Sequence, residues 1–239
     1  MKRTVSLAAF VAVALTMAQG MAADAPVVLK DKKDKISYSI GVQIGASVKQ
    51  QTLQQQVDVK PEMVAAGLKD ALTGAKMQLT DDQVRETLST LQQEVMDRQS
   101  QLADQNKKDG EKFLAQNKTK PGVKALPSGL QYQVLKEGKG QKPKASDTVK
   151  ANYKGTLING TEFDNSEKHG GAASFNLSGV IPGWTEALQL MPVGSKWRLF
   201  IPSDLAYREQ GAGGVIGPNS TLVFDVELLA IENEADPLK

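Results

Sequence analysis

The hydrophobic periodicity changes once along this chain, near residue 120, and that change limits the folds that the chain can adopt. Before this point apolar residues recur every three or four positions, as in the series Ile36, Ile40, Ile44 and Val48. After residue 127 they alternate, as in the series Leu130, Tyr132 and Val134. Side chains three or four residues apart share one face of a helix, whereas alternate side chains share one face of a strand. The sequence therefore predicts a helical first part followed by a sheet.

Three helices are predicted in the first part. The apolar series named above predicts a helix over residues 35–51. In the second helix, Pro61 suits the first helical position and Gly74 suits the C-terminal stop. The third helix begins at Thr80, which together with Gln83 has the spacing of a capping box.

The third helix is predicted to be a long stalk, because no proline interrupts residues 80–120. At 1.5 Å per residue it would measure about 55–60 Å. Apolar residues continue one seam along it at Val84, Leu88, Leu91, Val95 and Leu102. Later seam positions hold the polar residues Arg98, Gln105 and Asp109. We therefore predict that residues 24–79 and the apolar start of the stalk pair the chain in a homodimer, and that the polar half of the stalk is solvated.

The second part reads as one α+β domain. Residues 121–128 contain two prolines and a glycine and are predicted to be a linker. Asn159-Gly160 predicts a two-residue β-hairpin between two strands. A short helix is predicted over residues 184–190. Residues 129–232 should therefore form a twisted antiparallel sheet with a short helix packed on it.

The N-terminus has the features of a secretory signal. A basic start, Met1-Lys2-Arg3, precedes an apolar run over residues 7–17 and the small residues Gly20, Ala22 and Ala23. The run is shorter than the roughly 20 residues that a membrane-spanning helix needs, and no second apolar run of that length follows. We predict a signal peptide over residues 1–22, export to the periplasm and no membrane span. Association with the outer membrane or secretion is the alternative. Residues 233–239 are predicted to be a tail.

The composition excludes several classes of function. With 29 basic and 27 acidic residues, the net charge of +2 gives no reason to expect a nucleic-acid partner. The chain has no cysteine, which excludes disulfides, thiolate metal sites and cysteine nucleophiles. The one histidine, His169, leaves no room for a histidine-rich metal site, and we expect it to be an exposed loop residue. Neither a metal nor a cofactor is predicted.

Aromatic residues gather in the last third of the chain. They make up only 5% of the sequence, yet five of them stand at the ends of strand-like runs or beside turns between residues 153 and 224. Such a set can line a single apolar pocket. Almost no conventional catalytic side chain accompanies these aromatic residues. We therefore expect the function of this region to depend on the apolar pocket.

The order and spacing of the motifs in this region resemble those of the FK-binding immunophilins, which are peptidyl-prolyl cis-trans isomerases. The motifs are Val149-x-x-x-Tyr153-x-Gly155, Gly160-x-x-Phe163-Asp164, Val180-Ile181-Pro182-Gly183-Trp184, Leu190-Met191-x-x-Gly194, Ile201-Pro202, Ala206-Tyr207, Ile216-x-Pro218 and Thr221-Leu222-Val223-Phe224. The helical first part with its export signal is similar to the bacterial dimeric subgroup, which includes the macrophage infectivity potentiators and FkpA.

The resemblance implies which residues form the site. The catalytic set would be Tyr153, Phe163, Asp164, Ile181, Trp184, Tyr207 and Phe224, and the further substrate-binding set Phe175, Val180 and Ile216. Trp184 would be the floor of the pocket. The backbone N–H of Ile181 and the hydroxyl of Tyr207 would donate to substrate carbonyls. Asp164 would either face the substrate carbonyl carbon or hold Tyr153 in place. Arg208 stands where the family often has glycine.

An apolar pocket suits the chemistry that the resemblance implies. Rotation about an X-Pro bond breaks amide resonance and crosses a barrier of about 18–20 kcal/mol. The twisted amide is less polar than the planar one, so an apolar pocket favours it without any covalent step. The resemblance implies an isomerase that accelerates the folding of exported proteins, binds unfolded or proline-containing polypeptides and macrolide ligands, and also acts as a chaperone through its dimeric arm. The alternative is a holdase or a proline-peptide binding module with little turnover. A purely structural coiled-coil protein is disfavoured, because the second part carries no heptads.

Overall fold

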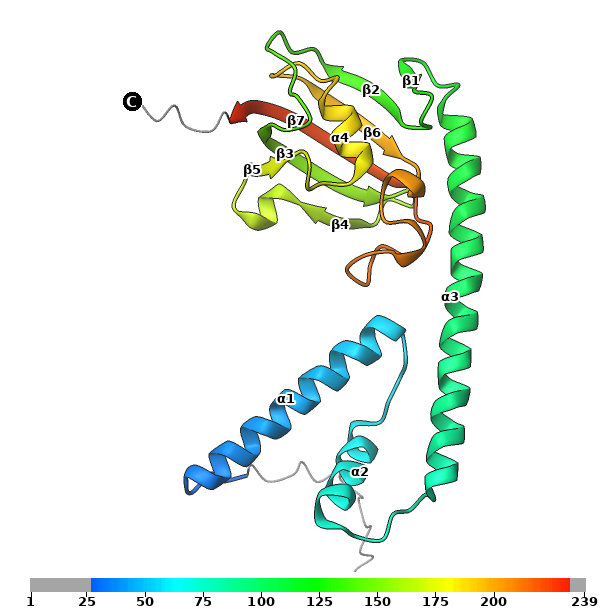
Figure 1. The fold of residues 1–239 in the computed structure, drawn as a ribbon, viewed down its shortest axis with the longest axis vertical. Coiled ribbons are helices and arrows are strands. Elements are labelled where there is room, and N and C mark those ends of the chain that lie inside the picture. Colours follow the sequence, from blue (N-terminus) through cyan, green and yellow to red (C-terminus); the bar gives the residue numbers. More distant parts are fainter. Residues whose placement is uncertain (1–26, 233–239) are drawn as a thin grey trace, which may run out of the picture. The chain divides into compact units, whose positions relative to one another are not determined.

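The computed structural model describes residues 27–232 (Figure 1). The described residues divide into two compact units, with the boundary between Gln50 and Gln51. The predicted signal peptide, residues 1–22, and the predicted tail, residues 233–239, lie outside the described residues. Within the described part, none of the helices combines the length and the hydropathy required to cross a lipid bilayer.

The first unit contains most of helix α1, which spans Lys32–Gln55 and extends beyond the predicted range of 35–51 at both ends. None of the residues of α1 is buried. Its apolar stripe is open, and the side chains of Ile36 and Ile40 are 50% and 53% exposed. Helices in proteins are stabilised mainly by packing an apolar face, and within the described residues the stripe of α1 remains exposed.

Helix α2 begins and ends, and helix α3 begins, at the capping residues that the sequence predicts, while α3 ends at Asn117 and so three residues before the predicted bound of 120. Helix α2 spans Pro61–Thr73, and Gly74 ends it in the left-handed conformation at φ 68° while its N–H donates to the Asp70 carbonyl. Helix α3 spans Asp81–Asn117. The capping box is confirmed in both directions, because the Gln83 N–H donates to Thr80 Oγ1 at 3.2 Å and the Thr80 N–H donates to Gln83 Oε1 at 2.9 Å.

The rest of the second unit is an antiparallel sheet with one short helix on it, which confirms the predicted α+β class (Figure 1). The strands are β1 (Val123–Ala125), β2 (Gln131–Lys136), β3 (Thr148–Leu157), β4 (Glu162–Asn165), β5 (Ala173–Asn176), β6 (Lys196–Ile201) and β7 (Leu222–Glu232). Their order is β1-β2-β6-β7-β3-β4, with β5 also pairing with β3. Helix α4 (Pro182–Leu188) packs Trp184 and Leu188 into the core. Three short 3-10 helices, η1 (Ser166–His169), η2 (Ser203–Leu205) and η3 (Arg208–Gln210), lie in the connections.

The strand alternation read from the sequence is visible in the burial of β7. Leu222, Phe224, Val226 and Leu228 are all buried, while the residues between them are not. Consecutive side chains of a strand point to opposite faces, so one face of β7 supplies the core.

Two local features differ from the prediction. The stretch 121–128, predicted to be a linker, contains β1, which pairs with β2. The hairpin around Asn159-Gly160 is confirmed, because β3 and β4 pair antiparallel, but its predicted two-residue turn is wrong. That turn requires φ above zero at both residues, and only Gly160, at 89°, meets this condition. The turn is longer, and the Leu157 N–H closes it by donating to the Thr161 carbonyl at 2.8 Å.

The second half of α3 packs against the sheet domain, so the prediction of a solvated polar half is wrong there. Asn106 Nδ2 donates to the Pro218 carbonyl at 2.8 Å. Asn117, only 1% exposed, donates from Nδ2 to Gln131 Oε1 at 3.0 Å. Gly110 lies so close to Thr221 that a Cβ atom there would sit 2.3 Å from the threonine Oγ1. The amide nitrogens of Asn106 and Asn117 therefore find acceptors on the domain, while Asn117 Oδ1 is buried without a partner among the described residues.

Candidate active site

Every site residue that the resemblance implied lines one hollow of about 560 Å³ on the sheet domain. These residues are Tyr153, Phe163, Asp164, Phe175, Val180, Ile181, Trp184, Tyr207, Ile216 and Phe224. They come from strands β3, β4, β5 and β7, the start of α4 and the loops beside it. Residues far apart in the sequence therefore share a single apolar cavity.

The strand register explains how the rings meet. Gly155 on β3 lies opposite Asp164 on β4 and opposite Phe224 on β7. The missing side chain leaves space that two rings occupy, because a Cβ at Gly155 would lie 2.4 Å from the ring of Phe163 and 2.8 Å from that of Phe224. A glycine in the middle of a strand is unfavourable by itself. Here its role is to let the two rings approach the sheet.

Trp184 forms the floor of the hollow. Its indole is 4% exposed and meets three rings edge to face, with centroids 5.2 Å away for Phe175, 5.3 Å for Phe224 and 5.5 Å for Tyr153. Such edge-to-face pairs are worth about 0.5–1.5 kcal/mol each beyond the area that they bury. Pro182 begins the α4 helix and fixes its first turn, which carries the indole. The floor is therefore held rigidly from several sides.

Asp164 is the one charged side chain among the lining residues, and it is fully hydrogen-bonded. The Tyr153 hydroxyl donates to Oδ2 at 2.6 Å, and the Asn165 N–H donates to Oδ1 at 2.9 Å. Burial by itself raises the pKa of Asp164, but the hydrogen bonds from Tyr153 and His169 outweigh it and lower the pKa below its usual value. Burial, and then the bond to Asp164, raise the pKa of Tyr153. A carboxylate and a neutral phenol therefore face the hollow at neutral pH.

His169 is the site residue that sequence reasoning missed. Its side chain is 58% exposed, as expected, but Nε2 lies 2.8 Å from Asp164 Oδ1. An ionised carboxylate only accepts hydrogen bonds, so Nε2 carries the proton. The 3-10 helix η1, capped by the Asn165 side chain through a 3.0 Å bond from the Lys168 N–H, turns the chain back to Asp164. The Asn165-Ser166 turn in the sequence was the feature that could have indicated this contact.

We expect the substitution His169→Ala to raise the pKa of Asp164 toward its usual value, because one of the hydrogen bonds that stabilise the carboxylate is lost. A depressed carboxyl pKa contributes stability above the unfolded-state pKa of about 3.9 that is lost as the pH falls through the folded value. The stability difference between His169→Ala and wild type should therefore be largest at neutral pH and shrink below about pH 4. NMR titration of the Asp164 carboxyl carbon and thermal unfolding at several pH values measure both effects. An unchanged Asp164 titration would contradict this role.

The two donors that the resemblance implied, on lining residues of the hollow, have no partner among the described residues, and the Nε1 of Trp184 likewise has none. The backbone N–H of Ile181 makes no bond, although the Ile181 carbonyl accepts from the Trp184 N–H at 2.9 Å. The Tyr207 hydroxyl is likewise unbonded, and burial and then the charge of Asp164 raise its pKa. Both donors are free to meet the carbonyl oxygens of a bound peptide.

Four more residues line the hollow that the sequence did not predict. Ala212, Gly213 and Val215 lie on the glycine-rich loop that precedes Ile216, and Gly179 lies on the loop before α4. Ala212 and Ile216 exchange backbone hydrogen bonds of 2.9 and 3.0 Å, so the loop is a closed turn. The sequence does not reveal this pairing, because it depends on the left-handed conformation of Gly213 and Gly214.

This arrangement is suited to non-covalent chemistry on an apolar group with adjacent carbonyls. The lining rings exclude water, and the free N–H and hydroxyl groups mark positions for carbonyl oxygens. The hydroxyl of Ser178 donates to Asn176 Oδ1 at 2.6 Å and that of Ser166 accepts from the Tyr153 N–H at 3.2 Å, and neither serine is among the lining residues. The hollow can therefore act through binding and orientation.

Comparison with known proteins gives consistent matches over most of the chain. Residues 33–134 match the domain amino-terminal to FKBP-type peptidyl-prolyl isomerases, and residues 139–229 match the FKBP-type peptidyl-prolyl cis-trans isomerases. The chain is 47% identical over 225 residues to the outer membrane protein MIP of Legionella longbeachae, covering 92% of this chain and 95% of that protein. It is 42% identical over 219 residues to the peptidyl-prolyl cis-trans isomerase Mip of Coxiella burnetii, covering 90% and 94%. The crystal structure of FkpA from Escherichia coli is 39% identical, with a TM-score of 0.61 over 86% of this chain and 99% of that one.

Proposed function

This chain belongs to the FKBP-type peptidyl-prolyl cis-trans isomerases, and we propose that its aromatic hollow holds the prolyl ring of the bond that it rotates. One observation carries this proposal: the rings of Tyr153, Phe163, Trp184 and Phe224 line the same cavity as Asp164. A prolyl ring is apolar and compact, and burying it against these rings is favourable by about 25 cal/mol per Å².

The rate enhancement follows from binding the twisted amide better than the planar one. The planar amide carbonyl is strongly hydrated, and the water-poor hollow disfavours it. The Ile181 N–H and the Tyr207 hydroxyl donate to the backbone carbonyls on either side of the rotating bond and hold one end of the peptide while the other turns. Two or three such interactions of about 1–1.5 kcal/mol give an acceleration of roughly tenfold each.

Asp164 contributes in one of two ways. Its bond to the Tyr153 hydroxyl fixes that ring against Trp184 and Phe175. In the alternative role, its negative charge acts on the carbonyl carbon of the rotating bond. The first role depends on hydrogen bonding and the second on charge, so an amide replacement separates them.

We expect macrolide ligands of the FKBP family to inhibit the enzyme at submicromolar to micromolar concentrations, because they would occupy the same hollow. The assay is a proline-limited refolding reaction with the full-length protein. Binding should also change the fluorescence of Trp184, which is the floor of the hollow, while Trp197 lies outside the lining residues. The variant Trp184→Leu should lose this fluorescence response, and Trp197→Phe should keep it. A ligand that changes neither rate nor fluorescence would argue against the proposed site.

We also propose that residues 24–79 form a dimerisation region, that residues 80–120 form the stalk and that residues 129–232 form the isomerase domain. Support comes from the large apolar side chains that the N-terminal helices leave open, including Met63 at 62% and Leu72 at 77% exposure. Exposed apolar surface of this extent is typical of an interaction site. Two catalytic domains on one dimer could hold one unfolded client at two prolines, and so gain avidity.

The dimer proposal predicts that the N-terminal helices set the oligomeric state. Full-length protein should sediment as a dimer, and a fragment beginning at residue 101 should sediment as a monomer. This fragment keeps Phe113 and Asn117, which pack on Phe200 and Gln131 of the sheet domain. Analytical ultracentrifugation over a range of concentrations gives the answer. A dimeric fragment would place the interface in the isomerase domain and overturn the proposal.

The exposed apolar residues of α1 and α2 favour a second activity, that of a holdase chaperone. An unfolded client offers apolar segments that these surfaces can bind whether or not proline is present. Suppression of aggregation of a client that lacks slow prolyl bonds measures holding alone. Comparing full-length protein with the fragment in that assay and in the refolding assay separates holding from turnover.

For localisation we propose export to the periplasm through the signal peptide of residues 1–22, with outer-membrane association as the alternative. The basic start and the apolar run support this proposal. One relative carries the name outer membrane protein. Fractionation of cells that produce the full-length chain would separate the two locations.

A further inference from the structure

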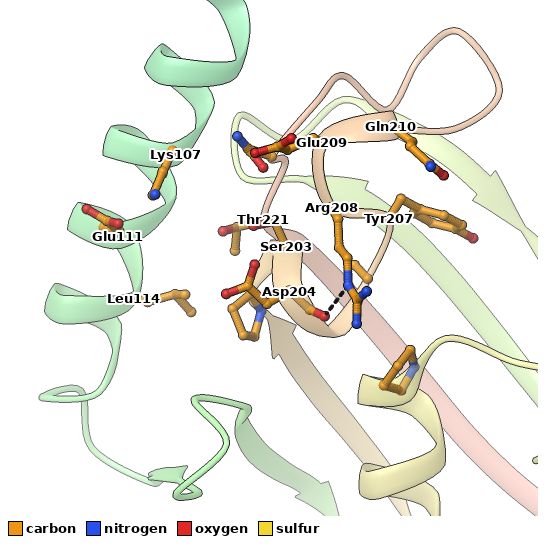
Figure 2. Close-up of a pocket in the computed structure, with 15 residues that line it drawn as sticks. Lys107, Glu111, Leu114, Ser203, Asp204, Tyr207, Arg208, Glu209, Gln210 and Thr221 are labelled. Carbon is orange, nitrogen blue, oxygen red and sulfur yellow. Dashed lines mark hydrogen bonds between the residues drawn. The ribbon is translucent and has the colours of Figure 1, made fainter.

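A second and more polar hollow, of about 650 Å³, lies between α3 and the turn that carries Tyr207 (Figure 2). Lys107 and Glu111 reach it from α3, and Asp204, Arg208 and Glu209 line it from the sheet domain. Nothing in the reaction described above uses this hollow. Its charged lining differs from the aromatic lining of the neighbouring site.

Hydrogen bonds and close packing fix both walls of the polar hollow. Asn106 on α3 donates to the Pro218 carbonyl at 2.8 Å, and this helix also packs Gly110 on Thr221. Across the hollow, the Asn219 N–H donates to the Arg208 carbonyl at 2.7 Å. This bond holds Arg208 in the left-handed region at φ 52°, which a non-glycine residue adopts only when its surroundings hold it there.

The polar hollow adjoins the aromatic hollow, since Tyr207 lines both of them. An extended polypeptide advances about 3.3–3.6 Å per residue. A client whose prolyl ring lies on Trp184 therefore needs only a few more residues to pass Tyr207 and reach α3. A free small ligand would have no such reason to bind at this place.

The charged side chains of the polar hollow form no ion pairs with other described residues. Among the described residues, none of Lys107, Glu111, Asp204, Arg208 and Glu209 takes part in an ion pair. Arg208 donates only to the Asp204 carbonyl, at 3.3 Å (Figure 2). The lining carries three carboxylates and two cations, an excess of one negative charge. Unpaired charges on opposite walls can interact with the polar side chains and the backbone of a bound polypeptide. Because the lining has one negative charge in excess, the hollow should prefer a polypeptide that carries positive charge.

We propose that this polar hollow is a second subsite of the isomerase, which binds the polypeptide that flanks the proline and favours basic residues in that flank. The inference rests on the proposed function of the aromatic hollow and extends it. Helix α3 is then part of the substrate site as well as a stalk, because Lys107 and Glu111 form one wall.

Charge reversal in full-length protein tests the subsite. The probes are peptides that share a neutral tetrapeptide containing proline, extended on either side by two lysines or by two glutamates. The readout is the ratio of kcat/KM for the lysine-flanked over the glutamate-flanked peptide at low ionic strength. We expect a ratio above one for wild type on the side that enters the hollow. Glu111→Lys should lower this ratio about fivefold, and Lys107→Glu should raise it about fivefold. Each reversal changes the charge of the hollow by two, and an exposed ion pair changes binding by up to a fewfold.

The control is Lys108→Glu, which makes the same charge change on the next residue of α3, outside the hollow. It should leave the ratio at the wild-type value. Turnover of the unextended tetrapeptide by wild type reports on the isomerase itself, so its absence would refute the proposed function rather than the subsite. A wild-type ratio of one on both sides, or equal shifts for Lys107→Glu and Lys108→Glu, would overturn the subsite.

Discussion

Replacing Asp164 by alanine should lower kcat/KM for a proline-containing peptide by ten- to a hundredfold. The substitution leaves the Tyr153 hydroxyl without its acceptor at 2.6 Å, and an unsatisfied buried polar group costs about 1–3 kcal/mol. It also removes the one charge from the lining of the aromatic hollow. Since each 1.36 kcal/mol corresponds to tenfold in rate, the two losses together account for this range. A protease-free peptide assay on the full-length protein gives the value.

Two companion variants separate the roles of Asp164. Asp164→Asn keeps an oxygen acceptor for the Tyr153 hydroxyl but removes the charge. If the carboxylate acts by holding Tyr153, this variant should retain most of the activity and Tyr153→Phe should resemble Asp164→Ala. If the charge acts on the substrate, Asp164→Asn should be as slow as Asp164→Ala. Urea unfolding of each variant shows how much of any loss comes from stability. An Asp164→Ala enzyme within threefold of wild type would remove this residue from the mechanism.

Local chemistry made the helix ends predictable from the sequence. Pro61, Gly74 and the pair Thr80 and Gln83 act within a few residues of their own positions, and the structure shows each of them in the expected conformation. Ten of the fourteen residues that line the aromatic hollow were also predicted, because the order and spacing of their motifs are those of a family with one fold. In both cases the information lies in short segments of sequence.

The missed features depend on contacts between distant segments. Asn106, Gly110 and Asn117 look like a solvated helix face, since two are polar and one is a weak helix former. They are instead matched to Pro218, Thr221 and Gln131, more than a dozen residues away in every case. For His169 the sequence analysis predicted an exposed loop residue, and it did not predict the bond from His169 to Asp164. Periodicity describes which side chains share a face, and it does not identify their partners.

Replacing Gly155 by valine should reduce both isomerase activity and macrolide affinity by at least about tenfold. A tenfold loss corresponds to 1.36 kcal/mol of binding free energy, and displacing two rings of the hollow should cost more than that. Valine favours a strand conformation, so the backbone of β3 should tolerate it. Its Cβ, however, would lie 2.4 Å from the ring of Phe163 and 2.8 Å from that of Phe224, and both rings would have to move into the hollow.

The matched control is Lys150→Val, an exposed position on the same strand. It makes a similar gain in strand propensity and should leave activity and affinity near wild type. Titration of the macrolide by Trp184 fluorescence and the peptide assay measure the two quantities, and urea unfolding reports the stability of each variant. If Gly155→Val bound the macrolide as wild type does, the rings of Phe163 and Phe224 would not form the wall of the substrate site. Gly155→Val could instead lose macrolide binding while its urea unfolding midpoint stays close to that of Lys150→Val. The loss of binding would then come from the changed shape of the aromatic hollow and not from a less stable fold.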